Sequence, residues 1–253
     1  MSAFGLAGKR ALITGSTRGI GFALAKALAG AGAEIILNGR DAEALGAASA
    51  ELADAGVKVR GVAFDVTSRD SVEEAVTWIE DEAGPIDILV NNAGMQHRAP
   101  LEDFPADKFE QVIATNLTSV FTVGQLVARR MIQRKAGKII NIASLQVEFA
   151  RASTVAYAAS KAGVANLTRA MATEWGRHGI NVNGIAPGYI NTEMNAALLA
   201  DPKFNAWVES RTPMGRWGEP SELGGAAVFL ASEAAAFVSG HILYVDGAFS
   251  ATM

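Results

Sequence analysis

The chain has 253 residues, of which 50% are hydrophobic, with a formal net charge of -4 and no cysteine. A chain of this length and apolar content can bury a large core within one domain. The acidic balance argues against nucleic-acid binding, which needs concentrated Lys and Arg, and the lack of cysteine excludes disulfide bonds and thiolate metal sites. No apolar run approaches the roughly 20 residues that cross a bilayer, and residues 1–5 lack the pattern of a signal peptide. We therefore expect a cytoplasmic protein with a small-molecule partner and neither a nucleic-acid nor a membrane partner.

Seven short runs rich in Val, Ile, Leu and Ala predict β-strands, at 10–14, 34–38, 57–64, 86–91, 138–143, 180–186 and 242–245. Helical patterns separate these runs. Runs that are continuously apolar rather than alternating are typical of strands buried on both faces. We therefore predict an α/β fold, a single doubly wound Rossmann-type domain over 1–253 with a seven-stranded parallel sheet and helices on both faces. The stretch 188–220 has no strand and three prolines, so we expect it to be a lid over the substrate site.

A glycine-rich segment follows the first predicted strand and opens the first predicted helix. Glycine permits a tight turn and a close approach of the backbone to a pyrophosphate, while the helix N-terminus presents free N–H groups to it. The segment therefore predicts a dinucleotide site, against the alternative of a glycine-rich turn without a ligand. Its residues are Gly15, Ser16, Thr17, Arg18, Gly19, Ile20 and Gly21.

The residues at the end of the second predicted strand indicate which dinucleotide is bound. Asn38 and Arg40 stand there, and no carboxylate is present to bind the ribose hydroxyls of NAD. The guanidinium groups of Arg40 and Arg18 can bind a phosphate in forked geometry, so NADP(H) is favoured over NAD(H) unless Arg40 pairs with Asp41 or faces solvent. Further cofactor contacts are expected after the third and fourth strands, at Asp65, which can accept from adenine, and at Val66, Asn92, Ala93 and Gly94.

Tyr157 and Lys161 are four residues apart, so on a helix their side chains share one face. An ammonium beside a phenol, whose pKa is about 10, favours the phenolate and makes the group a usable acid and base. A chance pair on a solvated helix face is the alternative. Ser144 favours catalysis, because it follows a predicted strand at the carboxyl edge of the sheet and can donate to a substrate oxygen. Asn116, inside a predicted helix over 108–134, needs a specific partner, and we expect it to hold a water for proton exit.

Together these motifs resemble the classical short-chain dehydrogenase/reductase family over essentially the whole chain. The residues that carry the resemblance are Thr14 with the glycine segment, Asn91-Asn92-Ala93-Gly94, Asn116, Ser144, Tyr157, Lys161, and Pro187-Gly188 with Thr192. The resemblance implies a tetrad in which Tyr157 is the acid and base and Ser144 polarises the carbonyl. Lys161 would hold the nicotinamide ribose and lower the tyrosine pKa, and Asn116 would support the water relay.

The same resemblance implies a reaction and an assembly. The expected reaction interconverts a secondary alcohol and a ketone by hydride transfer from the cofactor, without a metal. A homotetramer is implied, built with the helices predicted over 108–134 and 153–178. Cofactor contacts beyond the sixth strand are implied at Pro187, Gly188, Ile190 and Thr192.

Several loops resemble the gluconate 5-dehydrogenase subgroup of this family, among them 37–41, 95–100 and 211–218. The resemblance implies that D-gluconate and 5-keto-D-gluconate, or a related sugar acid, are interconverted. A sugar acid needs a cation for its carboxylate and polar groups for its hydroxyls. We expect Arg98 to bind the carboxylate. The substrate set is completed by Ser144, Tyr157, Gln146, Glu148 and Arg151.

Two other functions remain open from the sequence. A 3-oxoacyl-carrier-protein reductase would share the fold, tetrad and cofactor, and its acidic partner would need a basic patch such as 129–138 offers. Cations at a helix C-terminus also complement the helix dipole without any partner. A protein that senses NADP without turnover is the non-enzymatic alternative, and it would have no need of both Tyr157 and Lys161.

Overall fold

The seven strands predicted from the sequence all form in the computed structural model, which describes residues 3–252. They are β1 (Arg10–Ile13), β2 (Glu34–Gly39), β3 (Val59–Ala63), β4 (Ile88–Asn91), β5 (Gly137–Ile142), β6 (Ile180–Pro187) and β7 (Ile242–Val245). All neighbours are parallel, in the order β3-β2-β1-β4-β5-β6-β7. The predicted doubly wound, seven-stranded parallel sheet is confirmed. Met1 and Ser2, part of the segment compared with a signal peptide, lie outside the described residues.

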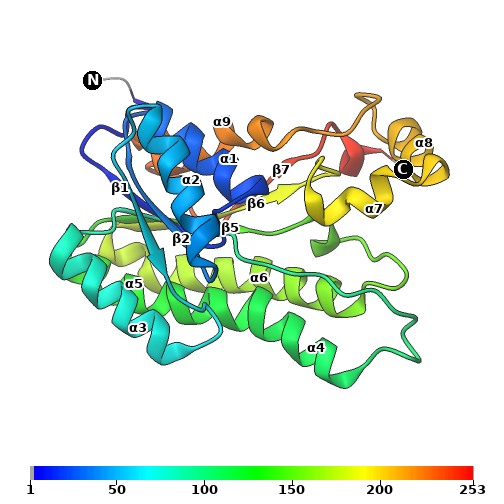
Figure 1. Ribbon diagram of the computed structural model, residues 1–253, viewed down its shortest axis with the longest axis horizontal. Helices are drawn as coiled ribbons and strands as arrows, with labels where there is room; N and C mark the ends of the chain where they lie inside the picture. The colour runs from blue at the N-terminus through cyan, green and yellow to red at the C-terminus, as the bar shows by residue number, and fades with distance from the viewer. Residues whose placement is uncertain (1–2, 253) are drawn as a thin grey trace.

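Helices cover both faces of the sheet (Figure 1). One face carries α1 (Gly19–Gly30), α2 (Ala42–Asp54) and α9 (Gly224–Ala231); the other carries α3 (Arg69–Trp78), α4 (Ala106–Ile113), α5 (Ser119–Arg134) and α6 (Val155–Trp175). Two short helices, α7 (Ala196–Leu199) and α8 (Pro202–Arg211), lie beyond the sheet near the C-terminal end of the chain. Asp41 and Ser68 accept hydrogen bonds from the first turns of α2 and α3, so each of these helices starts at a polar cap.

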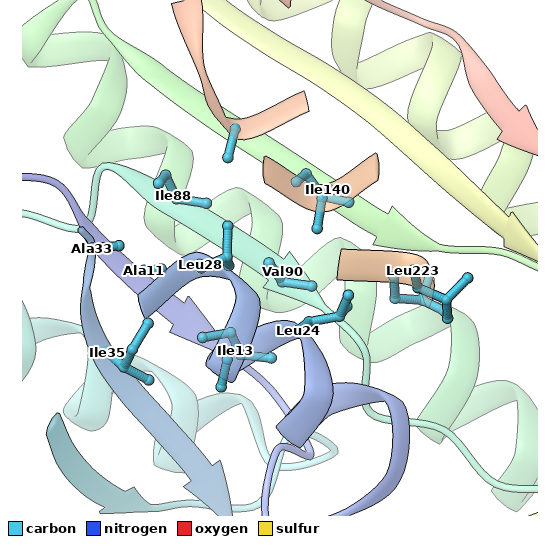
Figure 2. Packing of buried hydrophobic residues seen from close by; sticks show 14 of the residues in the cluster. Ala11, Ile13, Leu24, Leu28, Ala33, Ile35, Ile88, Val90, Ile140 and Leu223 are labelled. Atoms are coloured by element: carbon cyan, nitrogen blue, oxygen red, sulfur yellow. The ribbon is translucent and has the colours of Figure 1, made fainter. Parts of the chain in front are cut away.

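The core lies between the sheet and its two helical layers. Figure 2 shows Leu24 and Leu28 of α1 packed over Ile13 of β1 and Val90 of β4, all of them fully buried. Burial of each such side chain contributes about 1.5–3 kcal/mol. This packing holds the first helix rigidly on the sheet, and the glycine segment joins the two.

Two strands start later than the sequence pattern indicated, and one is less buried. The Val57 N–H donates to the Leu52 carbonyl at 3.0 Å, so Val57 closes α2 rather than opening β3. The Ile86 N–H donates to the Glu80 carboxylate at 3.0 Å instead of joining the ladder. The prediction that every strand is buried on both faces is wrong for β3, because this strand forms an edge of the sheet and Arg60 is exposed.

The strand order places the candidate site. β1 lies between β2 and β4, so the direction in which strands are added reverses at β1. In open α/β sheets, ligands bind outside the carboxyl ends of the strands at such a point. The glycine segment leaves the carboxyl end of β1, and Ser144 follows β5 at the same edge.

Candidate active site

A cleft of about 1570 Å³ runs along the carboxyl edge of the sheet. Its walls come from the glycine segment, the ends of β2 to β6, the start of α6 and the stretch from Pro187 to Arg211. Most of the predicted cofactor residues line it: Gly15, Thr17, Arg18, Gly19, Ile20, Gly21, Asn38, Arg40, Asp65, Val66, Asn92, Ala93, Gly94, Pro187, Gly188, Ile190 and Thr192. Ser144, Tyr157 and Lys161 line the same cleft. Residues distant in the sequence therefore meet in one space large enough for a dinucleotide and a small substrate.

The glycine segment has the geometry that a pyrophosphate needs. Gly15 has a φ of +60°, and a Cβ there would lie 2.9 Å from the Ala93 Cα. A Cβ on Gly21 would lie 2.5 Å from the Gly15 carbonyl oxygen. The Asn92 side chain braces the turn by donating to the carbonyls of Thr14 at 3.0 Å and Gly15 at 2.8 Å. The open backbone of this turn therefore fits a dinucleotide.

Two predicted cofactor residues brace the turn from behind. The Asn38 Oδ1 accepts from the Gly15 N–H at 3.1 Å, and its Nδ2 donates to the Phe64 carbonyl at 3.0 Å. Ser16 is fully buried, and its hydroxyl donates to the Ile13 carbonyl at 2.7 Å. The structure does not place Ser16 in the cleft, because this bond turns the side chain back into the protein. Ser16 therefore stabilises the turn rather than facing a ligand.

Arg18 and Arg40 line the cleft where it passes the carboxyl ends of β1 and β2. Arg40 is exposed, and the neighbouring Asp41 carboxylate is used to cap α2, accepting from Glu43 and Ala44. The pKa of the Asp65 carboxyl lies below its usual value. Burial alone would raise this pKa, but hydrogen bonds from Thr67 and the charge of Arg40 together outweigh burial and lower it. Asp65 is therefore ionised at neutral pH and can accept from an adenine amino group.

Asn116 lies within a π-helical stretch, Ala114–Thr118, that joins α4 to α5. Wider turns of this kind are frequent at functional sites. Its side chain is fully buried: Oδ1 accepts from the Met95 N–H at 2.8 Å, and Nδ2 donates to the Met95 carbonyl at 2.9 Å and to the Ser160 hydroxyl at 3.1 Å. Both amide protons are thus used within the protein. The Asn116 side chain does not line the cleft, and the expectation that it holds a water stays a prediction.

Ser160 connects this amide to the catalytic helix. Its hydroxyl donates to the Tyr157 carbonyl at 2.8 Å while accepting from Asn116. The chain of bonds ties α6 to the π-helical stretch and to the segment that follows β4. The sequence analysis missed Ser160, although its place between Tyr157 and Lys161 was visible.

Tyr157 and Lys161 lie on one face of α6, as their spacing predicted. The Lys161 Nζ lies 5.6 Å from the centre of the Tyr157 ring and donates to the Ile142 carbonyl at 2.6 Å. Burial lowers the pKa of Lys161 to about 8. Burial also raises the pKa of Tyr157, and a hydrogen bond with Ser144 opposes that rise. The expected lowering of the tyrosine pKa by Lys161 is therefore not found, because burial of the phenol dominates.

Three of the residues expected to bind substrate line the cleft beside this group: Arg98, Gln146 and Arg151. The Gln146 Oε1 accepts from the Thr154 hydroxyl at 2.8 Å, which fixes the amide at the wall. Glu148 is exposed and does not line the cleft. Burial, followed by the nearby Glu148 carboxylate, raises the pKa of Tyr244 to about 12. The Glu148 side chain therefore lies toward Tyr244 of β7 rather than in the cleft.

An aromatic cluster closes the far end of the cleft, and the sequence analysis missed it. The ring of Tyr189 contacts Phe204, Trp207, Trp217 and Phe249, with ring centres 5.3–5.8 Å apart. Two of these rings, Phe204 and Trp207, are three residues apart on α8 and so share one face. That spacing was the available signal.

The basic residues over 129–138 lie away from the cleft. They stand where α5 ends and β5 begins, at the amino edge of the sheet. Two of them have acidic partners: Arg134 lies 2.6 Å from Glu80, and Arg130 lies 3.7 Å from Asp81. An acidic carrier docked there would be on the opposite edge from Tyr157.

Within residues 3–252, no helix is both long and apolar enough to span a membrane. The same residues contain no group of three or more His, Asp or Glu side chains placed to hold a metal ion.

A family model described as enoyl-(acyl carrier protein) reductase matches residues 15–250. The chain belongs to the short-chain dehydrogenase/reductase family. It is an oxidoreductase that acts on CH–OH groups.

Individual proteins within the family are similar to this chain over nearly its whole length. The chain is 53% identical to gluconate 5-dehydrogenase of Gluconobacter oxydans, covering 99% of this chain and 98% of the relative. It is also 53% identical to 5-keto-D-gluconate 5-reductase of Escherichia coli, covering 96% of each. A crystal structure of a gluconate 5-dehydrogenase from Burkholderia cenocepacia in complex with NADP and tartrate superposes with a TM-score of 0.97 at 49% identity, over 99% of this chain and 98% of that one.

Proposed function

We propose that the chain is an NADP-dependent oxidoreductase that interconverts D-gluconate and 5-keto-D-gluconate. The observation that carries the proposal is one continuous cleft, with Arg18 and Arg40 at one end, Ser144, Tyr157 and Lys161 in the middle, and Arg98 beyond them. The names of the two relatives at 53% identity and the NADP in the Burkholderia cenocepacia structure support the same substrate and cofactor.

Two features hold the cofactor: a backbone turn open enough for a pyrophosphate, and cationic side chains for a further phosphate. The N-terminus of α1 and the open turn at Gly15 take the pyrophosphate, and Arg18 and Arg40 bind the 2'-phosphate that distinguishes NADP from NAD. Lys161 donates to Ile142 and keeps two further N–H donors for the nicotinamide ribose. When bound, NADPH supplies the hydride.

Tyr157 moves the proton. Its raised pKa keeps the phenol protonated at neutral pH, which is the form that donates to the oxygen of a ketone as it becomes an alcohol. Ser144 lies beside Tyr157, where it opposes the rise that burial causes in the phenol pKa, and it can donate to the substrate oxygen. Asn116 acts through Met95 and Ser160 as a positioning residue, and a water relay in its neighbourhood stays a prediction.

The stretch 188–220 is the substrate lid. It is tied at its base, where the Asn191 N–H donates to the Gly218 carbonyl at 2.8 Å. Across the cleft, Glu193 lies 3.0 Å from Arg18 of the glycine segment. This ion pair joins the lid to the cofactor side of the cleft. Arg18 therefore contacts the lid through Glu193 and is also the residue proposed to bind the cofactor phosphate.

We place the enzyme in the cytoplasm as a homotetramer. Exposed apolar side chains on α4 and α5, Phe109 and Phe121, support an interface on these helices. A chain without cysteine suits a reducing compartment, where disulfides do not form.

A panel of ketones with both cofactors tests the function. We expect NADPH to be oxidised with 5-keto-D-gluconate, and more slowly or not at all with acetoacetyl thioesters. Turnover of the thioesters alone would favour the carrier-protein reductase and contradict the sugar-acid assignment. Cofactor binding without turnover of any ketone would favour a sensor instead.

A further inference from the structure

Two guanidinium groups stand together at the substrate end of the cleft. Arg98 and Arg151 are both half-buried and both line it. Arg98 donates to the Gln96 side chain at 3.2 Å. No ion pair among the described residues includes either arginine.

The acidic residues that line the cleft are used elsewhere. Asp41 caps α2, Asp65 accepts from Thr67, and Glu193 pairs with Arg18. Burial and the like charge of Arg151 both lower the pKa of Arg98. Two partly desolvated cations that repel each other are costly to hold together, and an anion between them would offset that cost.

Arg151 is also in contact with the lid. Its guanidinium carbon lies 4.1 Å from the centre of the Phe204 ring on α8. Its positive charge also acts on Tyr189 and opposes the rise that burial causes in the pKa of that phenol. The Tyr189 ring contacts the same Phe204, with ring centres 5.7 Å apart. A cation–π contact of this kind favours one orientation of the planar guanidinium. Arg151 therefore connects the cleft wall that follows Ser144 to the proposed lid over 188–220.

We propose that Arg151 is a specificity-determining residue that binds the substrate carboxylate together with Arg98, and that its contacts with Phe204 and Tyr189 make closure of the lid depend on that carboxylate. The proposal rests on the proposed function, since it assumes a sugar acid in this cleft. A carboxylate offers two oxygens, one toward each guanidinium. With its charge matched, Arg151 stays stacked on Phe204 and the lid stays against the wall.

The test follows binding by tryptophan fluorescence in the NADP⁺-loaded enzyme. Trp207 and Trp217 both contact Tyr189, with ring centres 5.8 Å and 5.5 Å away, so they report on the lid. We expect D-gluconate to change the emission and sorbitol, an uncharged polyol of the same chain length, to leave it unchanged. Equal responses to the two ligands would overturn the proposal.

Variants separate the charge from the lid contact. Arg151→Met should weaken D-gluconate binding by about tenfold to a hundredfold, the usual worth of hydrogen bonds to a charged group. Arg151→Lys keeps the charge and loses the planar stack, so the gluconate-dependent emission change should fall even where the ligand still binds. Lys203→Met is the matched control, because Lys203 is a cation on α8 outside the cleft. An unchanged affinity in Arg151→Met would contradict the proposal.

Measurements of turnover separate a failure of this proposal from a failure of the proposed function. If D-gluconate binds in an Arg151-dependent way but is not oxidised, the function fails and the binding role stands. If the wild-type enzyme turns over 5-keto-D-gluconate and Arg151→Met keeps the same KM, the function stands and the role of Arg151 fails.

Discussion

At the scale of single residues, the site depends on polar groups that are buried and hydrogen-bonded. Asn116 and Ser160 use their side chains to join α6 to the π-helical stretch, and Lys161 donates to Ile142 from a buried position. Such groups are costly to leave unsatisfied, so each fixes its neighbours in place. The phenol of Tyr157 is held by this frame at the cleft surface.

Replacing Tyr157 by phenylalanine removes the proton donor and keeps the ring. We expect Tyr157→Phe to lose about 10²–10⁴-fold in kcat, the usual contribution of a general acid. The Kd for NADPH, measured by fluorescence titration, should stay within about twofold, because the ring still packs on α6. An unaffected kcat would remove Tyr157 as the proton donor.

The buried ammonium of Lys161 makes stability depend on pH. Its pKa is about 8 in the folded protein and 10.5 in the unfolded chain, so the unfolded state binds more protons between these values. The cost of burying the charge is full below about pH 8 and is relieved as pH rises toward 10.5. We expect the stability of the wild type relative to Lys161→Met to increase over this window in urea unfolding. A difference that stays constant with pH would contradict the lowered pKa.

At the scale of elements, the lid and the glycine segment are connected by the pair of Glu193 and Arg18. Both side chains are exposed, so the pair contributes at most about 1 kcal/mol. The pair also implies competition, because Glu193 and the 2'-phosphate of NADP would both bind the Arg18 guanidinium.

Neutralising Glu193 should therefore release Arg18 for the phosphate. We expect Glu193→Gln to tighten NADPH binding by up to about fivefold, within the range of an exposed ion pair, and to leave NADH nearly unchanged. The control is Glu209→Gln, since Glu209 is on α8, bonds Asn205 and does not line the cleft. Equal changes for NADPH and NADH, by calorimetry, would argue against competition.

Comparing the helices and strands with their predictions shows which features the sequence determines locally and which depend on the tertiary fold. The strands were predictable because central strands such as β4 are continuously apolar, and Tyr157 and Lys161 were predictable because helical spacing alone puts them on one face. The contact of Arg151 with Phe204 was not, since it joins segments that only the tertiary fold brings together. The positions of Ser16 and Glu148 were missed for a similar reason: hydrogen bonds and neighbours, not residue type, decide where a side chain points.

At the scale of the whole molecule, exposed aromatic residues mark where copies of the chain would meet. Phe121 on α5 is 44% exposed and Phe109 on α4 is 38% exposed. Both residues lie on the helices that we propose for the interface, and the oligomeric state can be measured directly.

A charge at Phe121 should be incompatible with a closed apolar interface. We expect the wild type to sediment near four times the 26.4 kDa chain mass and Phe121→Glu to sediment as a smaller species. Trp78→Glu, at a similarly exposed aromatic residue on α3, should leave the assembly intact. A monomeric wild type would rule out the proposed tetramer.

The central claim is that one cleft combines NADPH with a keto sugar acid and protonates the product through Tyr157. Product analysis tests it most directly: the wild type is incubated with NADPH and 5-keto-D-gluconate, and the products are quantified by NMR. We expect one D-gluconate for each NADPH consumed, and almost none with Tyr157→Phe. If NADPH is not consumed, or if the product is a different acid, the account is contradicted.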